Sequence, residues 1–422
     1  MAGLSLPSLQ IFANPRFARF WAGRWLATLA IQVQLTAMGW QVYDVARANG
    51  QSVPQAAFVL GLVGLAQFLP LLALSLYGGQ LADRQNRKLI LLAAYAGKAL
   101  IALGLALCAN LGAGIVTPAV FAAAVAAGAI NAFLPPAASA LMPMLVSREE
   151  LPKAVAWNSL AFNSGLIIGP AIGGNLYHFG PAIPYAAAFA LLAAAVSLLA
   201  GLRAPRQEEV KDARTLGMIV EGLRYVWSNK IVLGAISLDL VVVLLAGAVA
   251  LLPVFARDIL HAGPGEMGVL RSATGAGAAA VSLWLAVIPL RRRVGLWMFA
   301  STIVFGIATI VFGVSQSLWL TAAALAVAGG VDMVSVYVRQ SLIQLATPPP
   351  MQGRVAAVSF VFISASNELG DFEAGLMARL LGPSLAVTIG GGAAIAASLG
   401  WMRLFPALTR ADGFEPADRR SI

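Results

Sequence analysis

The chain has 422 residues, of which 59% are hydrophobic and only 11% are charged. Soluble domains carry about 25% charged residues, and a mean hydropathy of +0.83 is too high for a soluble protein with a polar surface. The formal net charge of +10 does not indicate nucleic-acid binding, because the basic residues lie in short clusters between apolar segments, as in the loops of a membrane protein.

Twelve apolar segments follow one another along the chain, and each has the length of about 20 residues that a membrane-spanning helix needs. Barrel strands would be shorter and would alternate in polarity. We therefore predict an all-α membrane protein with twelve transmembrane helices. The predicted spans are 18–43, 55–77, 89–110, 117–140, 154–177, 183–202, 231–256, 267–289, 295–315, 318–343, 355–380 and 384–405.

The basic residues are distributed unevenly between the two sets of loops. Of the 28 Lys and Arg, 21 lie in the termini and in every second loop, five lie within or at the edge of a span, and the opposite loops hold only Arg47 and Arg257. Because basic loops stay in the cytoplasm, we predict that both termini and the long loop near residues 203–230 are cytoplasmic.

The first span carries a polar stripe on an otherwise apolar helix. Arg24, Thr28, Gln32 and Thr36 are spaced four residues apart, so they share one helix face. With the neighbouring Gln34, this stripe is a candidate lining for a polar cavity. The alternative for Arg24 is that its side chain extends to the cytoplasmic headgroups.

The loop between the second and third spans contains a glycine, an acid and three bases at characteristic spacings: Gly79, Asp83, Arg84, Arg87 and Lys88. This pattern resembles the cytoplasmic loop signature of the major facilitator superfamily, although Asn86 stands where the signature has its second glycine. Asn tolerates a left-handed backbone better than most residues, so we expect the turn to be kept. The resemblance implies that these residues latch two halves of the protein together on the cytoplasmic side. Asp83 would then lie near a helix N-terminus, where a negative charge is favourable. An ordinary positive-inside loop is the alternative.

The fifth span contains a run of small residues and a proline: Gly165, Gly169, Pro170, Gly173 and Gly174. Small residues four apart let helix backbones approach closely, and neighbouring helices can accommodate the kink at a proline. The run resembles an element found in the fifth span of many exporters of the superfamily. Generic helix packing is the alternative.

The two halves of the chain are weakly similar, as in many secondary transporters: residues 169–174 fall opposite residues 370–375. We predict an N-terminal six-helix half at 1–202, a cytoplasmic linker at 203–230, and a C-terminal six-helix half with a cytoplasmic tail at 231–422. The linker is predicted to contain a short amphipathic helix on the membrane surface, or else an extension of the seventh span. Its apolar residues have helical spacing: Leu216, Ile219, Val220, Leu223 and Trp227.

Ionisable side chains within spans are costly to bury and are candidates for function. Asp239 lies in the seventh span, and Asp332 and Arg339 lie in the tenth. The resemblance implies that spans one and seven line a central cavity. Arg24 and Asp239 lie at matching depths, so they could pair across the halves; a local hydrogen bond is the alternative for Asp239. Lys98, in the third span, is expected to extend to the headgroups.

The eleventh span holds a polar group at mid-depth: Asn367, Glu368, Asp371 and Glu373. Glu368 and Asp371 are three residues apart and share a helix face. Glu373 is about 140° from Glu368 around the helix, so we expect Glu368 or Asp371, rather than Glu373, to carry a transported proton. A structural ion-pair network that joins Glu368 to the two charged residues of the tenth span is the alternative.

The sequence contains no P-loop and no cluster of His, Cys and carboxylates with metal-ligand spacing. We therefore expect no enzymatic activity, no catalytic residue, no metal and no cofactor, with a proton gradient as the driving force. The proton-coupling candidates are Asp332, Glu368, Asp371 and Asp239. The substrate-cavity candidates are Arg24, Thr28, Gln32, Gln34, Arg339 and Asn367.

The resemblance extends over nearly the whole chain and includes shorter elements such as Glu221-Gly-Leu-Arg224 and Met351-Gln-Gly353-Arg354. The chain resembles the superfamily branch that contains the enterobactin exporter. This implies the major facilitator fold, with two pseudo-symmetric halves, and export of a siderophore or an amphipathic drug-like compound by alternating access in a bacterial inner membrane. The expected partners are a small-molecule substrate and the bilayer, without nucleic acid, and the protein is expected to be a monomer. The alternatives are a lysophospholipid flippase and a nutrient importer of the same fold.

Overall fold

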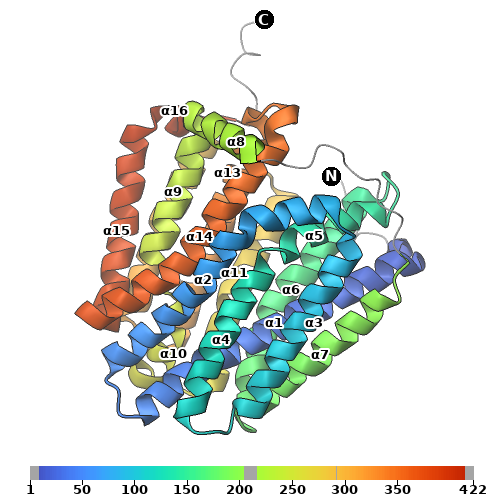
Figure 1. Cartoon of the computed structure of the whole chain (residues 1–422). Helices are drawn as coiled ribbons and strands as arrows, with labels where there is room; N and C mark the ends of the chain where they lie inside the picture. The colour runs from blue at the N-terminus through green and yellow to red at the C-terminus, as the bar shows by residue number, and fades with distance from the viewer. Residues whose placement is uncertain (1–8, 204–215, 291, 414–422) are drawn as a thin grey trace, which may run out of the picture. The chain divides into compact units, whose positions relative to one another are not determined.

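The computed structural model describes residues 9–203, 216–290 and 292–413, and these residues form helices without any strand (Figure 1). Ten helical segments of the described chain are long and apolar enough to cross a membrane. Two further long helices cover the predicted first and eleventh spans, so every predicted span is helical. The main helices are α1 (Pro15–Ala48), α2 (Val53–Arg84), α3 (Arg87–Cys108), α4 (Ala113–Asn131), α6 (Leu151–Tyr177), α7 (Ala182–Ala200), α9 (Lys230–Ala246), α11 (Pro264–Val287), α12 (Val294–Val314), α13 (Leu318–Ala346), α14 (Pro349–Leu381) and α15 (Pro383–Leu404).

Two of the predicted spans are interrupted. The fourth span divides into α4 and α5 (Leu134–Leu141), because Pro135 and Pro136 occupy positions that suit the start of a helix but not its interior. The seventh span, predicted at 231–256, corresponds to one segment that is long and apolar enough to cross a membrane, Lys230–Ile259, but it is not one continuous helix. Instead, α9 ends at Ala246 and is followed by η3 (Ala248–Leu251), α10 (Leu252–Val254) and the π-helical η4 (Phe255–Ile259).

Asparagine side chains begin three of the helices. Asn14, Asn86 and Asn229 precede α1, α3 and α9, and each side chain accepts a hydrogen bond from a backbone N–H of the first turn. Asn86 does not use the left-handed conformation that Asn tolerates, since its φ of −61° and ψ of 109° are extended. The turn between α2 and α3 is therefore stabilised by a helix cap.

The described chain forms two compact units. Unit 1 contains residues 9–51, 66–203 and 261–272, and unit 2 contains residues 52–65, 216–260 and 273–413. In unit 1, α1 packs on α6 and α7, and α3 packs on α4 and α7; in unit 2, α12 packs on α13 and α15, and α9 packs on α14 and α15. The start of α2 belongs to unit 2 and the start of α11 to unit 1. The predicted division at residues 203–230 stays a prediction.

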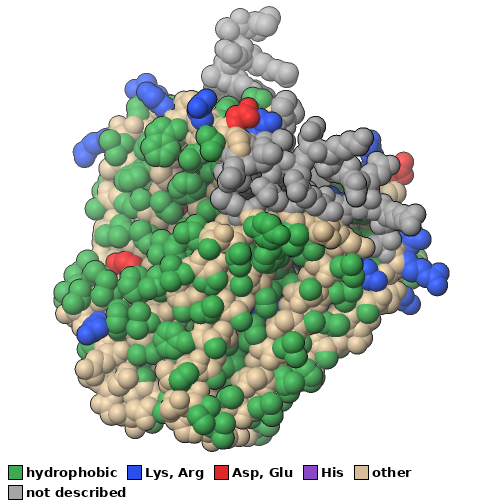
Figure 2. All heavy atoms as spheres, in the orientation of Figure 1, with side chains coloured by type: hydrophobic (Ala, Val, Ile, Leu, Met, Phe, Trp, Pro, Cys, Tyr) green, Lys and Arg blue, Asp and Glu red, His purple; other side chains and the backbone are tan. Residues whose placement is uncertain are grey.

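Each unit has an apolar core of its own. Phe17, Phe20 and Leu192 are fully buried in unit 1, and Met298 and Phe299 are fully buried in unit 2. Apolar side chains also dominate the molecular face that Figure 2 shows, and most Lys and Arg in view lie at its margins. An apolar exterior with basic margins is what a membrane-embedded helical protein requires.

The linker prediction falls partly on residues 204–215, which lie outside the described residues. Beyond them, α8 (Leu216–Ser228) is a separate helix, because Asn229 begins α9. Val226 is buried against α9 and α14, while Trp227 is 68% exposed. Glu221 pairs with Arg354 at 2.5 Å, which attaches α8 to the start of α14. The position of α8 on the membrane surface stays a prediction.

Candidate functional site

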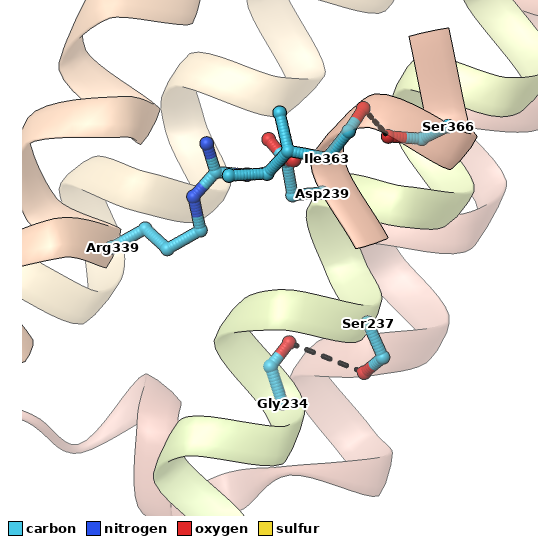
Figure 3. Close-up of polar contacts among 6 residues, drawn as sticks. All are labelled: Gly234, Ser237, Asp239, Arg339, Ile363 and Ser366. Atoms are coloured by element: carbon cyan, nitrogen blue, oxygen red, sulfur yellow. Dashed lines mark hydrogen bonds and ion pairs between the residues drawn. The ribbon is translucent and has the colours of Figure 1, made fainter. Parts of the chain in front are cut away.

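A buried ion pair joins α9 to α13. Arg339 Nη1 contacts Asp239 Oδ2, and the two side chains are only 5% and 7% exposed (Figure 3). Buried charges of this kind persist when they are paired, because removing each ion from water is costly. Asp239 thus finds its partner within its own unit, and the predicted pair with Arg24 is not the one observed. Arg339 likewise has Asp239 as a partner, a pairing that the alternative network of Asp332, Arg339 and Glu368 did not include.

A small cavity adjoins this pair in unit 2. Its volume of about 10 Å³ is enough for one water molecule. Asp332 lines the cavity beside Asp239, so α9 and α13 together bring two carboxyl groups to one place. Ser301, Thr302 and Ser335 complete its polar lining. Ser335 Oγ is buried and has no hydrogen-bond partner among the described residues.

The charges around this cavity do not balance. Asp239 is paired with Arg339, whereas Asp332 has no ion pair or hydrogen bond within the described part of the chain. With both acids ionised, the cluster would carry one negative charge in excess inside a membrane-spanning helix bundle. Such a charge is costly without a partner. The cluster therefore has the chemistry to take up one proton or to hold a polarised water molecule.

The acids of α14 lie at a different place in unit 2. A Cβ placed on Gly64 of α2 would lie 2.9 Å from Asp371 Cβ and 3.2 Å from Glu368 O, so this part of α14 packs against α2. Neither acid lines the cavity beside Asp332, and Asn367 is exposed. The structure thus separates the four predicted proton-coupling acids into two pairs.

The polar stripe of α1 packs against the glycines of α6 in unit 1. A Cβ placed on Gly165 would lie 2.6 Å from Thr28 Cγ2, and one placed on Gly169 would lie 2.5 Å from Gln32 Cβ. The Thr28 hydroxyl donates to the Arg24 carbonyl at 2.9 Å. Thr28 and Gln32 therefore contribute to close helix packing, and their role as cavity lining stays a prediction.

The other two substrate-cavity candidates of α1 have different surroundings. Gln34 is 6% exposed, and its Oε1 has no hydrogen-bond partner among the described residues. Arg24 is half-buried and interacts electrostatically with Tyr95 of α3. Among the substrate-cavity candidates on this helix, Arg24 is thus the one that offers a positive charge to a bound anion.

The proline of α6 sits where α11 crosses it. A Cβ placed on Gly268 would lie 2.4 Å from Pro170 O, and one placed on Gly174 would lie 3.0 Å from Gly268 Cα. Ser272 Oγ donates to Ile167 O at 2.5 Å. A side chain of α11 thus supplies a hydrogen bond close to the proline, as membrane helices often do for a disturbed backbone. Gly173 packs in turn on Val33 of α1.

The bases of the loop after α2 contact helix ends within unit 1. Arg87 Nη1 donates to Ala140 O at 3.2 Å, and Lys88 Nζ donates to Ala200 O at 2.8 Å. The latter carbonyl ends α7, where a positive charge is favourable. The surroundings of Gly79 and the side chains of Asp83 and Arg84 are not among the described parts of the structure, so the predicted latch between the halves stays a prediction.

Two ionisable residues differ from the sequence-based expectations. Lys98 is only 4% exposed and thus enclosed by protein, so its expected extension to the headgroups is wrong. Glu373, which we expected to be less important than Glu368 and Asp371 for carrying a proton, lines a cavity where α9 ends. Gly247 and Pro253 in the seventh span were the signal that could have identified this place, because such residues interrupt transmembrane helices at binding sites.

Known proteins are similar to this chain over most of its length. A model of a transmembrane secretion effector family within the major facilitator superfamily matches residues 7–418. The enterobactin exporter EntS of Citrobacter koseri is 25% identical over 399 residues, which cover 94% of this chain and 93% of the exporter. The enterobactin exporter EntS of Shigella boydii is 28% identical over 360 residues, which cover 85% of this chain and 83% of that protein.

Solved structures of transporters have the same fold. A D-xylose–proton symporter superposes with a TM-score of 0.71 at 14% identity and covers 94% of this chain and 98% of its own. A human organic anion transporter superposes with a TM-score of 0.65 at 16% identity and covers 92% of this chain and 99% of its own. At these identities the likeness concerns the fold alone.

Proposed function

Because the chain belongs to the transmembrane secretion effector family of the major facilitator superfamily, we propose that it exports a small molecule and that a proton gradient drives this export. The proposed location is a bacterial inner membrane, with both termini in the cytoplasm. The observation that carries the proposal is the buried cluster of two acids and one base in unit 2: Asp239, Asp332 and Arg339.

Proton coupling follows from the charge balance of this cluster. Protonation of Asp332 removes its excess negative charge, and burial favours the neutral carboxyl group. Alternating access would expose the cavity to water on one side of the membrane at a time. Asp332 would then gain a proton while it faces the acidic side and lose it while it faces the cytoplasm. Asp239 remains paired with Arg339 and positions the guanidinium.

The names of the relatives support the type of cargo. Relatives that align over most of this chain are exporters of enterobactin, so we propose an anionic, siderophore-like compound. Arg24, half-buried on α1, is the proposed contact for its negative charge. The chemistry of the transport cycle needs no cofactor.

The test uses the purified protein in proteoliposomes with an acidic lumen and enterobactin supplied outside. We expect the unmodified protein, and a control Glu149→Gln variant at an exposed position, to accumulate enterobactin in the lumen against its gradient. Asp332→Asn should abolish this accumulation but keep downhill exchange, because the cargo path remains. Full accumulation by Asp332→Asn would show that the cluster is structural.

Lysophospholipid flipping is a second candidate, which one observation favours. An apolar groove of about 430 Å³ in unit 1 is lined by Leu89 and Ile90 of α3, Ile130 of α4 and Phe133, with Gln85 and Asn86 at its polar end. An acyl chain with its polar head at Asn86 would suit this lining. Movement of a fluorescent lysophospholipid, without enterobactin accumulation in the same vesicles, would favour the flippase.

A further inference from the structure

The break after α9 leaves backbone oxygens without their usual partners. The helix ends at Ala246, and Gly247, with φ of −70° and ψ of 61°, departs from helical geometry. In the described backbone no hydrogen bond from the next turn reaches the carbonyls of Leu244, Leu245 or Ala246. Free carbonyls at a helix C-terminus carry partial negative charge, and in a membrane they need another partner.

Glycines of two neighbouring helices let those helices pack closely against the carbonyl oxygens at the end of α9. A Cβ placed on Gly390 of α15 would lie 2.2 Å from Leu245 O, and one placed on Gly370 of α14 would lie 3.0 Å from Val243 O. A larger residue at Gly390 would displace the Leu245 carbonyl. The small residues thus fix the end of α9 against α14 and α15, all within unit 2.

Glu373 faces the same break. It lines a cavity of about 10 Å³ together with Leu245, Ala246 and Gly247 of the break and with Ala386 of α15. Glu373 is half-buried and has no ion pair or hydrogen bond within the described residues. It is the ionisable residue of this lining, and its charged neighbours on α14 are Asp371, which packs on α2, and Arg379, which stacks on the Phe58 ring.

The Glu373 carboxylate, when ionised, and the carbonyls at the end of α9 are hydrogen-bond acceptors. A carboxylate and uncapped carbonyls repel one another unless a positive charge lies between them. Oxygen ligands of this kind suit a hard cation, and ends of interrupted membrane helices bind sodium ions or protons in transporters. We infer that Glu373 and the carbonyls at the end of α9 form a binding site for a proton or a sodium ion.

The depth of the site fits loading from the side opposite the basic loops. Glu373 lies eight residues before the end of α14, about 12 Å along a helix, and that end is predicted to be periplasmic. An ion bound there would enter with the gradient that drives export. The inference rests on the proposed function for its role in coupling, whereas binding itself needs no cargo.

The first measurement uses the unmodified protein, so that folding of a variant does not matter. Dicyclohexylcarbodiimide reacts with protonated carboxyl groups in apolar surroundings, and mass spectrometry locates the adduct. We expect modification of Glu373 and none of the exposed Glu149. Protection by sodium chloride, but not by choline chloride, would identify sodium; modification that responds to pH alone would identify the proton. Absence of any adduct at Glu373 would overturn the inference.

The second measurement compares the thermal stability of Glu373→Gln with that of Glu149→Gln. Ligands that bind the folded state raise Tm, so sodium chloride or acidification should raise the Tm of the control by several degrees. Glu373→Gln should lose the response to sodium chloride if the ion is sodium, and if it is the proton it should lose part of the response to acidification, because Asp332 keeps its own. An equal response in both variants would overturn the inference. A different result would count against the proposed cargo alone: the Tm of the control responds to the ion and that of Glu373→Gln does not, yet the unmodified protein does not transport enterobactin.

Discussion

Among single residues, the charges around Arg339 give the clearest prediction. Asp239→Asn leaves a buried guanidinium without its counter-ion, and Arg339→Gln leaves a buried carboxylate without its partner. Breaking a buried pair in this way costs about 3–5 kcal/mol. We therefore expect both variants to unfold at clearly lower temperature than the unmodified protein when the purified proteins are heated in detergent.

Asp332→Asn is the matched control, because it removes an acid of the same cavity that has no base of its own. Its melting temperature should stay near that of the unmodified protein or rise. If Asp332→Asn destabilised the protein as much as Asp239→Asn does, Asp332 would also depend on Arg339, and the proposed proton site would have to be abandoned.

The sequence identified Asp239 and Arg339 as unusual but not as partners. A charge within an apolar segment can be seen without a structure, and so can its depth along the helix. Whether two helices turn those charges toward one another depends on helix rotation and tilt, which the spacing along one chain does not determine. For the same reason Glu373 seemed less important than Glu368, although Glu373 faces the break at Gly247.

Among the helices, the packing of α6 on α1 can be tested with one substitution and one control. A leucine at Gly169 would need space where Gln32 Cβ lies 2.5 Å from a Cβ at that position. Overpacking of this kind costs about 1–3 kcal/mol or more. Gly169→Leu should therefore lower the melting temperature or the yield of folded protein, as measured by fluorescence-detected size exclusion after heating.

Gly104→Leu on α3 is the matched control, because no atom lies within 4 Å of a Cβ at Gly104. This variant should resemble the unmodified protein. Equal losses in both variants would mean that leucine is poorly tolerated in these helices in general, and the specific contact between α6 and α1 would lose its support.

The sequence predicted the helices well and their contacts less well. Every predicted span contains a helix, because apolar length is a strong signal. The interruptions at Phe133 and Gly247 were missed, since the apolar segments continue through them. The glycines of α6 and the polar stripe of α1 were both recognised, yet the sequence assigned one to packing and the other to a cavity. The structure places them against each other.

For the whole molecule, each unit includes a segment from the other half of the sequence. In unit 2 a Cβ placed on Gly375 would lie 2.7 Å from Gly61 Cα, and in unit 1 one placed on Gly174 would lie 3.0 Å from Gly268 Cα. The sequence repeat had already placed Gly174 opposite Gly375. It did not reveal their partners, because each partner belongs to the other half of the sequence. The two contacts are thus equivalent members of one repeated arrangement.

The orientation in the membrane is the last prediction, and it rests on 21 basic residues on one side against two on the other. On a Cys108→Ala background, single cysteines at the exposed Ala48 and Gln316 should react in intact cells with a thiol reagent that cannot cross the membrane. Cysteines at the exposed Gln85 and Ser147 should react only after the cells are opened. Arg47, one of the two basic residues on the opposite side, does not weaken this expectation. Its Nη1 donates to Gln51 O at 2.6 Å, so its side chain stabilises the turn that follows α1. Labelling of Gln85→Cys in intact cells would show that the orientation is the reverse of the predicted one. The loading side inferred for Glu373 would then be cytoplasmic, and a proton gradient could no longer drive export through it.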